Sequence, residues 1–160
     1  KNKNISSILL LSEYGEDVIY SKKIIDKLKL NENIIWMPQM KRKELLEIIP
    51  SCDVGIGEFY QTPQNLWGGC GLEIMASGKP LIHSFKFNKN EFQQIYGCPP
   101  PPICIANTQE SIYKWLDKFG SSKKIKDKIS KDTLDWFNEY DGKKSAKRIL
   151  DICLDKENAN

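Results

Sequence analysis

Residues 65–83 decide the fold that this sequence predicts, and they read NLWGGCGLEIMASGKPLIH. The glycines give way at residue 71 to a helix-forming run, and Gly78 is a residue type that commonly ends a helix. Pro80 and the three residues after it form a short apolar run that suits a buried strand. We therefore expect a helix over residues 71–76 and, after a tight turn, a strand over residues 80–83.

The rest of the chain repeats this alternation of short strands and helices. Predicted strands cover residues 7–11, 34–37, 53–57, 80–83 and 103–105, and predicted helices cover residues 17–30, 45–49, 71–76, 108–119, 121–140 and 143–154. Such alternation is typical of βαβ units in a parallel sheet. We predict an α/β fold with a doubly wound, Rossmann-like parallel sheet. The prolines before residues 103–105 favour an edge position for that strand.

Length and composition favour a single domain with a packed core. The chain has 160 residues, of which 40% are apolar; we place the domain at residues 1–155 and expect residues 156–160 to fray. No apolar run approaches the roughly 20 residues that span a bilayer. Five cysteines form no CxxC pair and there is a single histidine, so we expect no metal site and a reducing, cytoplasmic location.

Charge is nearly balanced along the chain, with 24 basic and 21 acidic residues and a formal net charge of +3. Lysines alternate with aspartates between residues 121 and 140, as they do on the solvated face of a helix. Nucleic-acid binding proteins usually gather arginine and lysine on one face together with aromatic residues. We therefore expect no nucleic-acid partner.

The glycines before the predicted helix at residues 71–76 are the densest candidate for a binding site. Ligands of doubly wound sheets bind outside the carboxyl ends of the strands, and this segment connects such a strand end to the helix. Gly68, Gly69 and Gly71 allow a diphosphate to approach the backbone, and first-turn N–H groups attract anions. The carboxylate of Glu73 can accept hydrogen bonds from two sugar hydroxyls. Glycine content alone, however, favours a plain flexible loop.

The segment 72–82, LEIMASGKPLI, resembles the LEAMAxGxPVV signature of glycosyltransferase family 4 and its relatives with the GT-B fold. The preceding elements follow a similar order, since residues 34–38 and 51–54 resemble two strands of that family. Residues 135–140 resemble its C-terminal helix. The resemblance covers nearly the whole chain, as the donor-binding C-terminal domain of such an enzyme.

This resemblance implies a transferase that moves a sugar from a nucleoside diphosphate sugar to an acceptor, with retention and without a metal or other cofactor. Glu73 corresponds to the glutamate that binds the donor ribose. The other implied donor-binding positions are Gly68, Gly69, Gly71, Leu72, Asn65, Pro38 and Gln39. Glu58 and Trp67 are candidates for contact with the donor sugar. The resemblance assigns no catalytic residue to this chain.

Departures from the family pattern limit what we expect of the chain alone. Asn65 stands where the family commonly has a glutamate, and Glu58-Phe59 replaces its Pro-Ser. We expect the family's first strand upstream of Lys1. The N-terminal acceptor domain is expected in the same chain or on a partner chain, with any peripheral membrane association through that half. The chain should then bind nucleotide weakly and catalyse nothing alone. The alternative is a non-catalytic interaction module that keeps the glycosyltransferase fold.

Other conspicuous side chains have simpler structural interpretations. A single histidine at a strand end, such as His83, is more often structural than catalytic. Trp67 could stack on a base or sugar, or cover the core; Glu58 could reach the donor sugar or remain a solvated carboxylate. Tyr113 and Trp136 are expected in the core. Asp53 begins its strand instead of ending it, which counts against a receiver domain.

Overall fold

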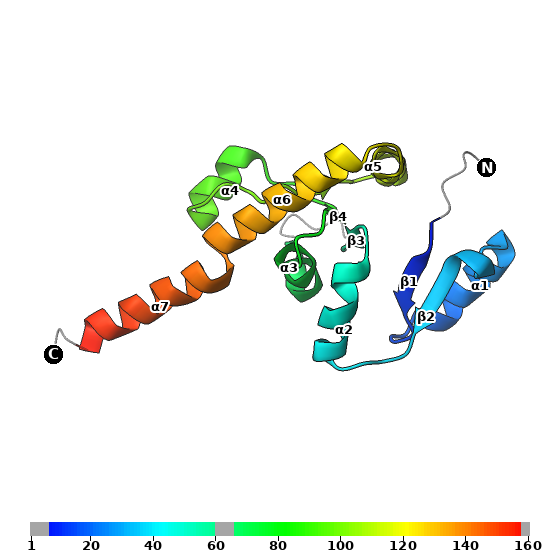
Figure 1. The fold of residues 1–160 in the computed structure, drawn as a ribbon, viewed down its shortest axis with the longest axis horizontal. Coiled ribbons are helices and arrows are strands. Elements are labelled where there is room, and N and C mark those ends of the chain that lie inside the picture. Colours follow the sequence, from blue (N-terminus) through cyan, green and yellow to red (C-terminus); the bar gives the residue numbers. More distant parts are fainter. Residues whose placement is uncertain (1–6, 60–65, 158–160) are drawn as a thin grey trace. The chain divides into compact units, whose positions relative to one another are not determined.

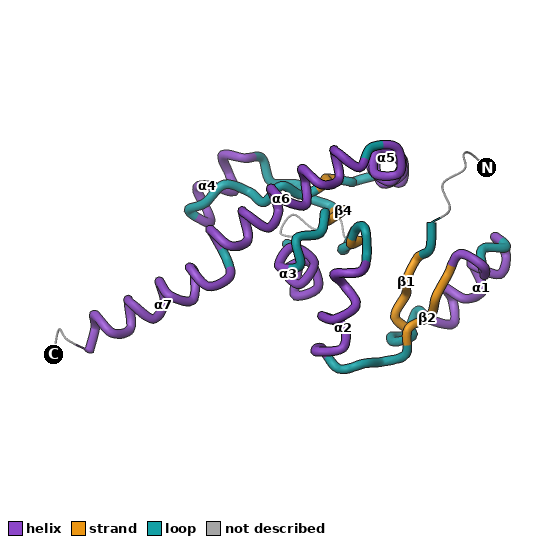
Figure 2. Tube along the Cα trace, viewed as in Figure 1, coloured by secondary structure: helices purple, strands orange, loops and turns teal. Residues whose placement is uncertain are grey.

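The structure is a computed structural model that describes residues 7–59 and 66–157 and shows an α/β protein rich in helix (Figure 1, Figure 2). The chain forms two compact units, Lys1–Leu45 and Leu46–Asn160, each with its own small parallel sheet. The predicted α/β class and parallel pairing are thus confirmed. Within the described ranges the strands belong to two sheets, and no single doubly wound sheet is shown.

The first unit is a βαβ arrangement. Its strands β1 (Leu9–Ser12) and β2 (Ile34–Met37) pair in parallel. α1 (Val18–Leu28) connects them and buries Ile25, and a short 3-10 helix over Asn31–Asn33 leads into β2. The predicted bounds of β2 are confirmed, while α1 is shorter at both ends than its predicted range.

The second unit contains a three-stranded parallel sheet in the order β3-β4-β5. These strands are Gly55–Ile56, Leu81–His83 and Cys104–Ile105. β4 lies in the middle and is buried along its whole length, whereas β5 lies at an edge, as its prolines predicted. A core cluster forms on this sheet from Ile82, Cys104, Ala106 and Phe119.

The remaining α-helices of the described residues are α2 (Arg42–Ile48), α3 (Gly68–Ala76), α4 (Lys89–Tyr96), α5 (Gln109–Ser121), α6 (Lys123–Tyr140) and α7 (Gly142–Glu157). α2 continues as a 3-10 helix over Ile49–Ser51. α3 packs against β3, β4 and α6, and α6 also packs against α5 and α7. Figure 1 shows α7 as the last helix before the C-terminus.

α3 begins at Gly68, earlier than the predicted start at residue 71. Gly68, Gly69 and Gly71 therefore lie in the first turn of the helix, and the expectation that they precede it is wrong. The predicted end of the helix at Ala76 is confirmed. Gly78, two residues later, has a φ of 65° and ends the helix as predicted. Gly68 has a left-handed φ of 58°. Glycine adopts this conformation at little cost because it has no Cβ.

Two glycines of the predicted strand 53–57 allow neighbouring side chains to lie against its backbone. A Cβ at Gly55 would lie 2.5 Å from the side chain of Ile74 on α3, and one at Gly57 would lie 2.4 Å from Nδ1 of His83. Cβ atoms are essentially never found that close to another heavy atom. α3 and β4 thus lie directly against the backbone at these two glycines.

α4 has no counterpart among the predicted helices. The Asn88 side chain accepts a hydrogen bond from the Glu91 N–H at 2.9 Å, and the Glu91 carboxylate accepts one from the Asn88 N–H at 3.1 Å. This capping box starts the helix, and Gly97 with a φ of 69° ends it. Phe92 is the buried residue of α4. Ile95 and Tyr96 follow it at helical spacing, so this apolar pattern and the capping residues were the available signals.

The C-terminal helices are close to their predicted ranges. Exposed ion pairs of α6 join residues four apart, as between Lys123 and Asp127 at 2.7 Å, which confirms the solvated lysine-aspartate face. Trp136 is buried as expected. Tyr113 is 52% exposed, so its predicted place in the core is wrong. It lies about 100° around α5 from Ile112, which packs on the core cluster.

Candidate functional site

The end of β3 is fixed to the end of β4 through the main chain of Glu58. The N–H of Glu58 donates to Nδ1 of His83 at 3.0 Å. Its carbonyl accepts from both the N–H and the hydroxyl of Ser84, each at 3.1 Å. Glu58 is exposed, yet its backbone position at the carboxyl edge of the sheet is set by two consecutive residues of the neighbouring segment.

The N-terminus of α3 lies beside this carboxylate. Oε1 of Glu58 is 3.4 Å from the position that a Cβ on Gly68 would occupy. The N-cap residue Trp67 makes no side-chain hydrogen bond to the helix. Among residues 7–59 and 66–157, no atom lies within 4 Å of the Cβ position of Gly69. First-turn N–H groups lack partners within their own helix, so an open, uncapped glycine turn can receive an anion.

The three glycines of this turn have different surroundings. A Cβ on Gly69 would meet no neighbour among the described residues, whereas a Cβ on Gly71 would lie 2.5 Å from Cβ of Trp67. Gly71 is buried, and Leu72 is half-buried beside it. The structure therefore leaves Gly68 and Gly69 accessible and gives Gly71 a packing role.

Two carboxylates act on the same thiol of α3. The pKa of Cys70 is raised by partial burial first, and then by the negative charges of Glu73 and Glu58. The structure thus brings Glu58, Cys70 and Glu73 into one electrostatic neighbourhood near the start of α3. Glu73 is half-buried and has an interaction partner within the chain. Such carboxylates accept hydrogen bonds from hydroxyl groups.

Trp67 takes the core-covering role of the two that the sequence left open. Its side chain is 8% exposed, and its ring centroid lies 5.7 Å from Trp136, 5.9 Å from Phe92 and 6.5 Å from Phe85. This aromatic cluster holds Trp67, the N-cap residue of α3, in the core. The face of the indole is consequently occupied by neighbouring rings.

The other predicted donor-binding positions do not belong to the described part of the second unit. Pro38 and Gln39 follow β2 in the first unit and are both exposed. Asn65 lies outside the described residues. The structure thus brings Glu58 and Glu73 together with the glycines of α3, all within the second unit.

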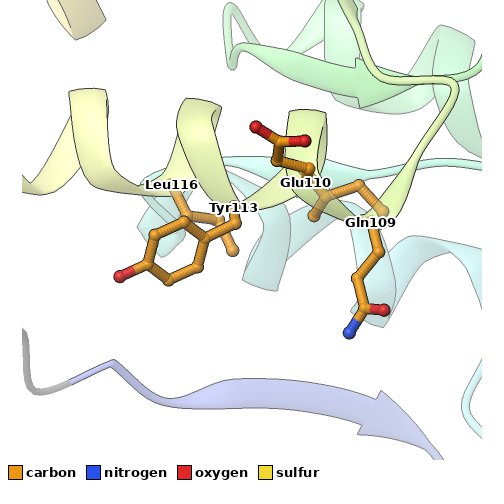
Figure 3. Close-up of a pocket in the computed structure, with 5 residues that line it drawn as sticks. Gln109, Glu110, Tyr113 and Leu116 are labelled. Atoms are coloured by element: carbon orange, nitrogen blue, oxygen red, sulfur yellow. The ribbon is translucent and has the colours of Figure 1, made fainter. Parts of the chain in front are cut away.

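A shallow pocket on α5 was not predicted from the sequence (Figure 3). It has a volume of about 460 Å³ and is lined by Gln109, Glu110, Ile112, Tyr113 and Leu116. None of these residues belongs to the predicted site. The exposed aromatic ring of Tyr113, one turn before Leu116, was the available signal for an apolar depression.

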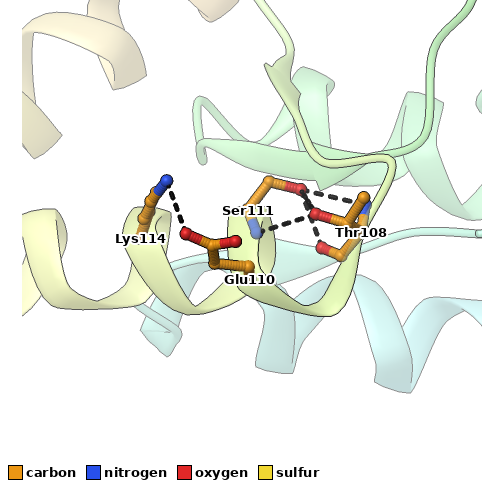
Figure 4. A network of polar contacts seen from close by, with 4 residues as sticks. All are labelled: Thr108, Glu110, Ser111 and Lys114. Atoms are coloured by element: carbon orange, nitrogen blue, oxygen red, sulfur yellow. Dashed lines mark hydrogen bonds and ion pairs between the residues drawn. The ribbon is translucent and has the colours of Figure 1, made fainter.

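The start of α5 beside this pocket is held by a polar network (Figure 4). The Thr108 hydroxyl accepts from the Ser111 N–H at 3.2 Å, and the Ser111 hydroxyl accepts from the Thr108 N–H at 3.0 Å. Thr108, the first residue of the predicted helix 108–119, is thus its N-cap. Glu110 forms an ion pair with Lys114 at 2.8 Å. Thr108 and Ser111 cap the helix, and the Glu110–Lys114 ion pair lies on its exposed face. The pocket itself offers mainly apolar contact.

No protein-family model, no curated protein and no solved structure matches this chain. Within residues 7–59 and 66–157, no helix combines the length and the apolar character needed to cross a membrane. Over the same residues, no group of three or more histidine, cysteine, aspartate or glutamate side chains is placed to hold a metal ion. Function is therefore inferred from the geometry around α3.

Proposed function

We propose that this chain is the donor-binding half of a GT-B glycosyltransferase, which transfers a sugar from a nucleoside diphosphate sugar to an acceptor. One observation carries the proposal. The uncapped glycine turn at the start of α3 lies beside Glu58 at the carboxyl end of β3, with Glu73 on the same helix. Parallel α/β sheets place their ligands at that edge. The resemblance of residues 72–82 to the family signature supports the assignment.

Different residues of the site bind different parts of the donor. The first-turn amides at Gly68 and Gly69 face the diphosphate, because helix N-termini favour negative charge. Two carboxylates close to that turn disfavour further phosphate contact and favour neutral hydroxyls. We assign Glu73 to the ribose hydroxyls and Glu58 to hydroxyls of the transferred sugar.

The reaction is a retaining transfer that needs no metal. Negative charge develops on the leaving diphosphate, and preorganised amide donors stabilise such charge in the transition state. This chain supplies that stabilisation through its backbone amides. We assign no catalytic side chain to it. The acceptor is selected by an N-terminal domain, in the same chain or in a partner, and this chain without it is inactive.

The proposal includes the finer architecture that the family resemblance implies. We infer a doubly wound, Rossmann-like domain, in which the turn after β2 with Pro38 and Gln39 belongs to the nucleobase contacts. A cytoplasmic protein, associated peripherally with membranes through its acceptor-binding half, fits this function.

Calorimetric titration of the chain with UDP, GDP, ADP and their glucose conjugates tests the proposal. One of the nucleotides should bind saturably, and Glu73→Ala should weaken its binding at least tenfold. The reason is that hydrogen bonds to a charged group contribute about 1.5–3 kcal/mol, and each 1.4 kcal/mol is a factor of about ten.

Glu47→Ala is the matched control, since Glu47 is an exposed glutamate on α2. It should leave the affinity unchanged. Equal affinities for Glu73→Ala and the unaltered chain would contradict the ribose assignment. Absence of binding by every nucleotide would contradict the donor role and favour the non-catalytic interaction module.

A further inference from the structure

His83, the single histidine of the chain, is completely buried at the carboxyl end of β4. Its ring packs directly against the backbone that follows β3, since a Cβ on Gly57 would lie 2.4 Å from Nδ1. Any side chain at residue 57 would therefore displace the imidazole. The glycine and the histidine form one close contact at the edge of the proposed site.

The hydrogen bond from Glu58 determines the tautomer of this ring. Nδ1 accepts the N–H of Glu58 at 3.0 Å, and a nitrogen that accepts carries no proton. The neutral ring of His83 must then carry its proton on Nε2. Nε2 is buried and has no hydrogen-bond partner among the described residues. An interaction with the backbone of Leu66 favours the protonated ring and raises the pKa of His83, against the effect of burial.

The same imidazole helps to place the Glu58 carboxylate. The peptide groups on both sides of Glu58 are held, by His83 at its N–H and by Ser84 at its carbonyl. With the backbone fixed, Oε1 reaches the N-terminal glycine turn of α3 at Gly68. Loss of the bond to Nδ1 removes one of the three hydrogen bonds that hold the main chain of Glu58, and the only one of the three at its N–H.

We propose that His83 is a positioning residue of this site, whose neutral imidazole holds Glu58 beside the N-terminus of α3 and whose protonation releases it. A proton on Nδ1 would point at the N–H of Glu58, so two donors would face each other and the hydrogen bond would be lost. The inference rests on the proposed function only for what Glu58 contacts. The hydrogen bond and its loss are properties of the chain itself.

The groups around the ring favour its neutral form near pH 7. Burial lowers the pKa of His83 below its ordinary value of 6.5, and the Glu58 carboxylate only partly opposes this. On the packed elements, α3 carries Cys70 and Glu73, and β5 carries Cys104. Burial raises the pKa of both thiols, that of Cys104 to about 12, so they remain neutral. Release of Glu58 is therefore expected in acid, below pH 6.5.

Nitrogen-15 NMR of the imidazole tests the hydrogen bond directly, because one histidine gives one set of ring signals. At pH 7.5 we expect Nε2 protonated and Nδ1 unprotonated, and the amide proton of Glu58 should shift with the same midpoint as the ring. His83→Asn keeps an acceptor oxygen near the place of Nδ1 and cannot titrate, so its Glu58 amide should stay constant. His83→Leu, without an acceptor, should show the released position at every pH.

Two results would overturn the inference: a proton on Nδ1 at pH 7.5, or a Glu58 amide that ignores the titration of the ring. If His83→Leu does not fold, the unaltered chain and His83→Asn still decide the question. The NMR result does not depend on any nucleotide.

Calorimetry with UDP-, GDP- and ADP-glucose, and with the free diphosphates, tests whether protonation of His83 affects binding at the proposed site. Binding of the sugar conjugate should weaken about fivefold when the pH falls below the His83 midpoint, as expected for one lost hydrogen bond. The free diphosphate should be much less affected, and His83→Asn should remove the difference. A pH-independent affinity in the unaltered chain would refute the role of His83. Absence of binding at every pH, with the NMR result as expected, would refute the proposed function alone.

Discussion

At the scale of single residues, the glycine turn of α3 should tolerate a side chain at residue 69 and not at residue 71. Gly71→Ala should destabilise the chain by about 1–3 kcal/mol, because its Cβ would lie 2.5 Å from Cβ of Trp67 and the core would be overpacked. Gly69→Ala should be neutral or stabilise by up to about 1 kcal/mol, because its Cβ meets no neighbour in the part of the chain that the structure describes and alanine favours a helix. Urea unfolding of both variants measures the two free energies.

The two glycine variants control for each other, since both add one methyl group to the same turn. Equal unfolding free energies for Gly69→Ala and Gly71→Ala would contradict the packing described here.

The sequence could not distinguish these glycines. It indicated close approach to a backbone at residues 68–71, but whether a neighbour is a ligand, solvent or Trp67 depends on how the chain packs. The place of Trp67 in an aromatic cluster depends likewise on Phe92, which lies on a helix absent from the prediction. His83 was predicted as structural, and its bond to Glu58 depends on the pairing of β3 with β4.

At the scale of elements, α4 depends on its capping box. Asn88→Ala should lower the unfolding free energy by about 1 kcal/mol, because the Glu91 N–H loses its acceptor at the start of the helix. Gln94→Ala is the matched control, since Gln94 is an exposed amide later in α4, and it should change the stability by less than about 0.5 kcal/mol. Chemical unfolding followed by circular dichroism compares them; equal losses would show that the cap is not what stabilises α4.

Element types were predictable where apolar runs were long or sharply bounded, as for β2. The start of α3 was not predictable, because glycine has a low helix propensity and tertiary contacts outweigh it there. β3 is shorter than its predicted range because only Gly55 and Ile56 pair with β4. The division of the strands between two sheets has no signal in local periodicity.

At the scale of the whole molecule, stability should depend on pH through the single histidine. The pKa of His83 is lower in the folded chain than its ordinary value of 6.5, so the unfolded chain binds this proton more tightly. The corresponding stability is complete above pH 6.5 and is lost as the pH falls through the folded pKa. The slope is limited to about 1.4 kcal/mol per pH unit for one proton.

Urea unfolding between pH 7.5 and pH 5 measures this dependence, and His83→Asn should flatten it. Asp53 does not interfere, because its hydrogen bond and ion pair with Lys126 keep its pKa below 3.8. Parallel curves for the unaltered chain and His83→Asn would contradict the assignment of the slope to this residue.

The proposed function of the molecule is tested most directly by mapping where a nucleotide binds. Backbone amide NMR spectra should be recorded during titration with UDP-, GDP- and ADP-glucose. We predict that one conjugate shifts the amides of Gly68, Gly69 and Glu73 most strongly and leaves the α5 pocket at Tyr113 unchanged. Shifts confined to the α5 pocket, or no shifts with any conjugate, would contradict the donor site at α3.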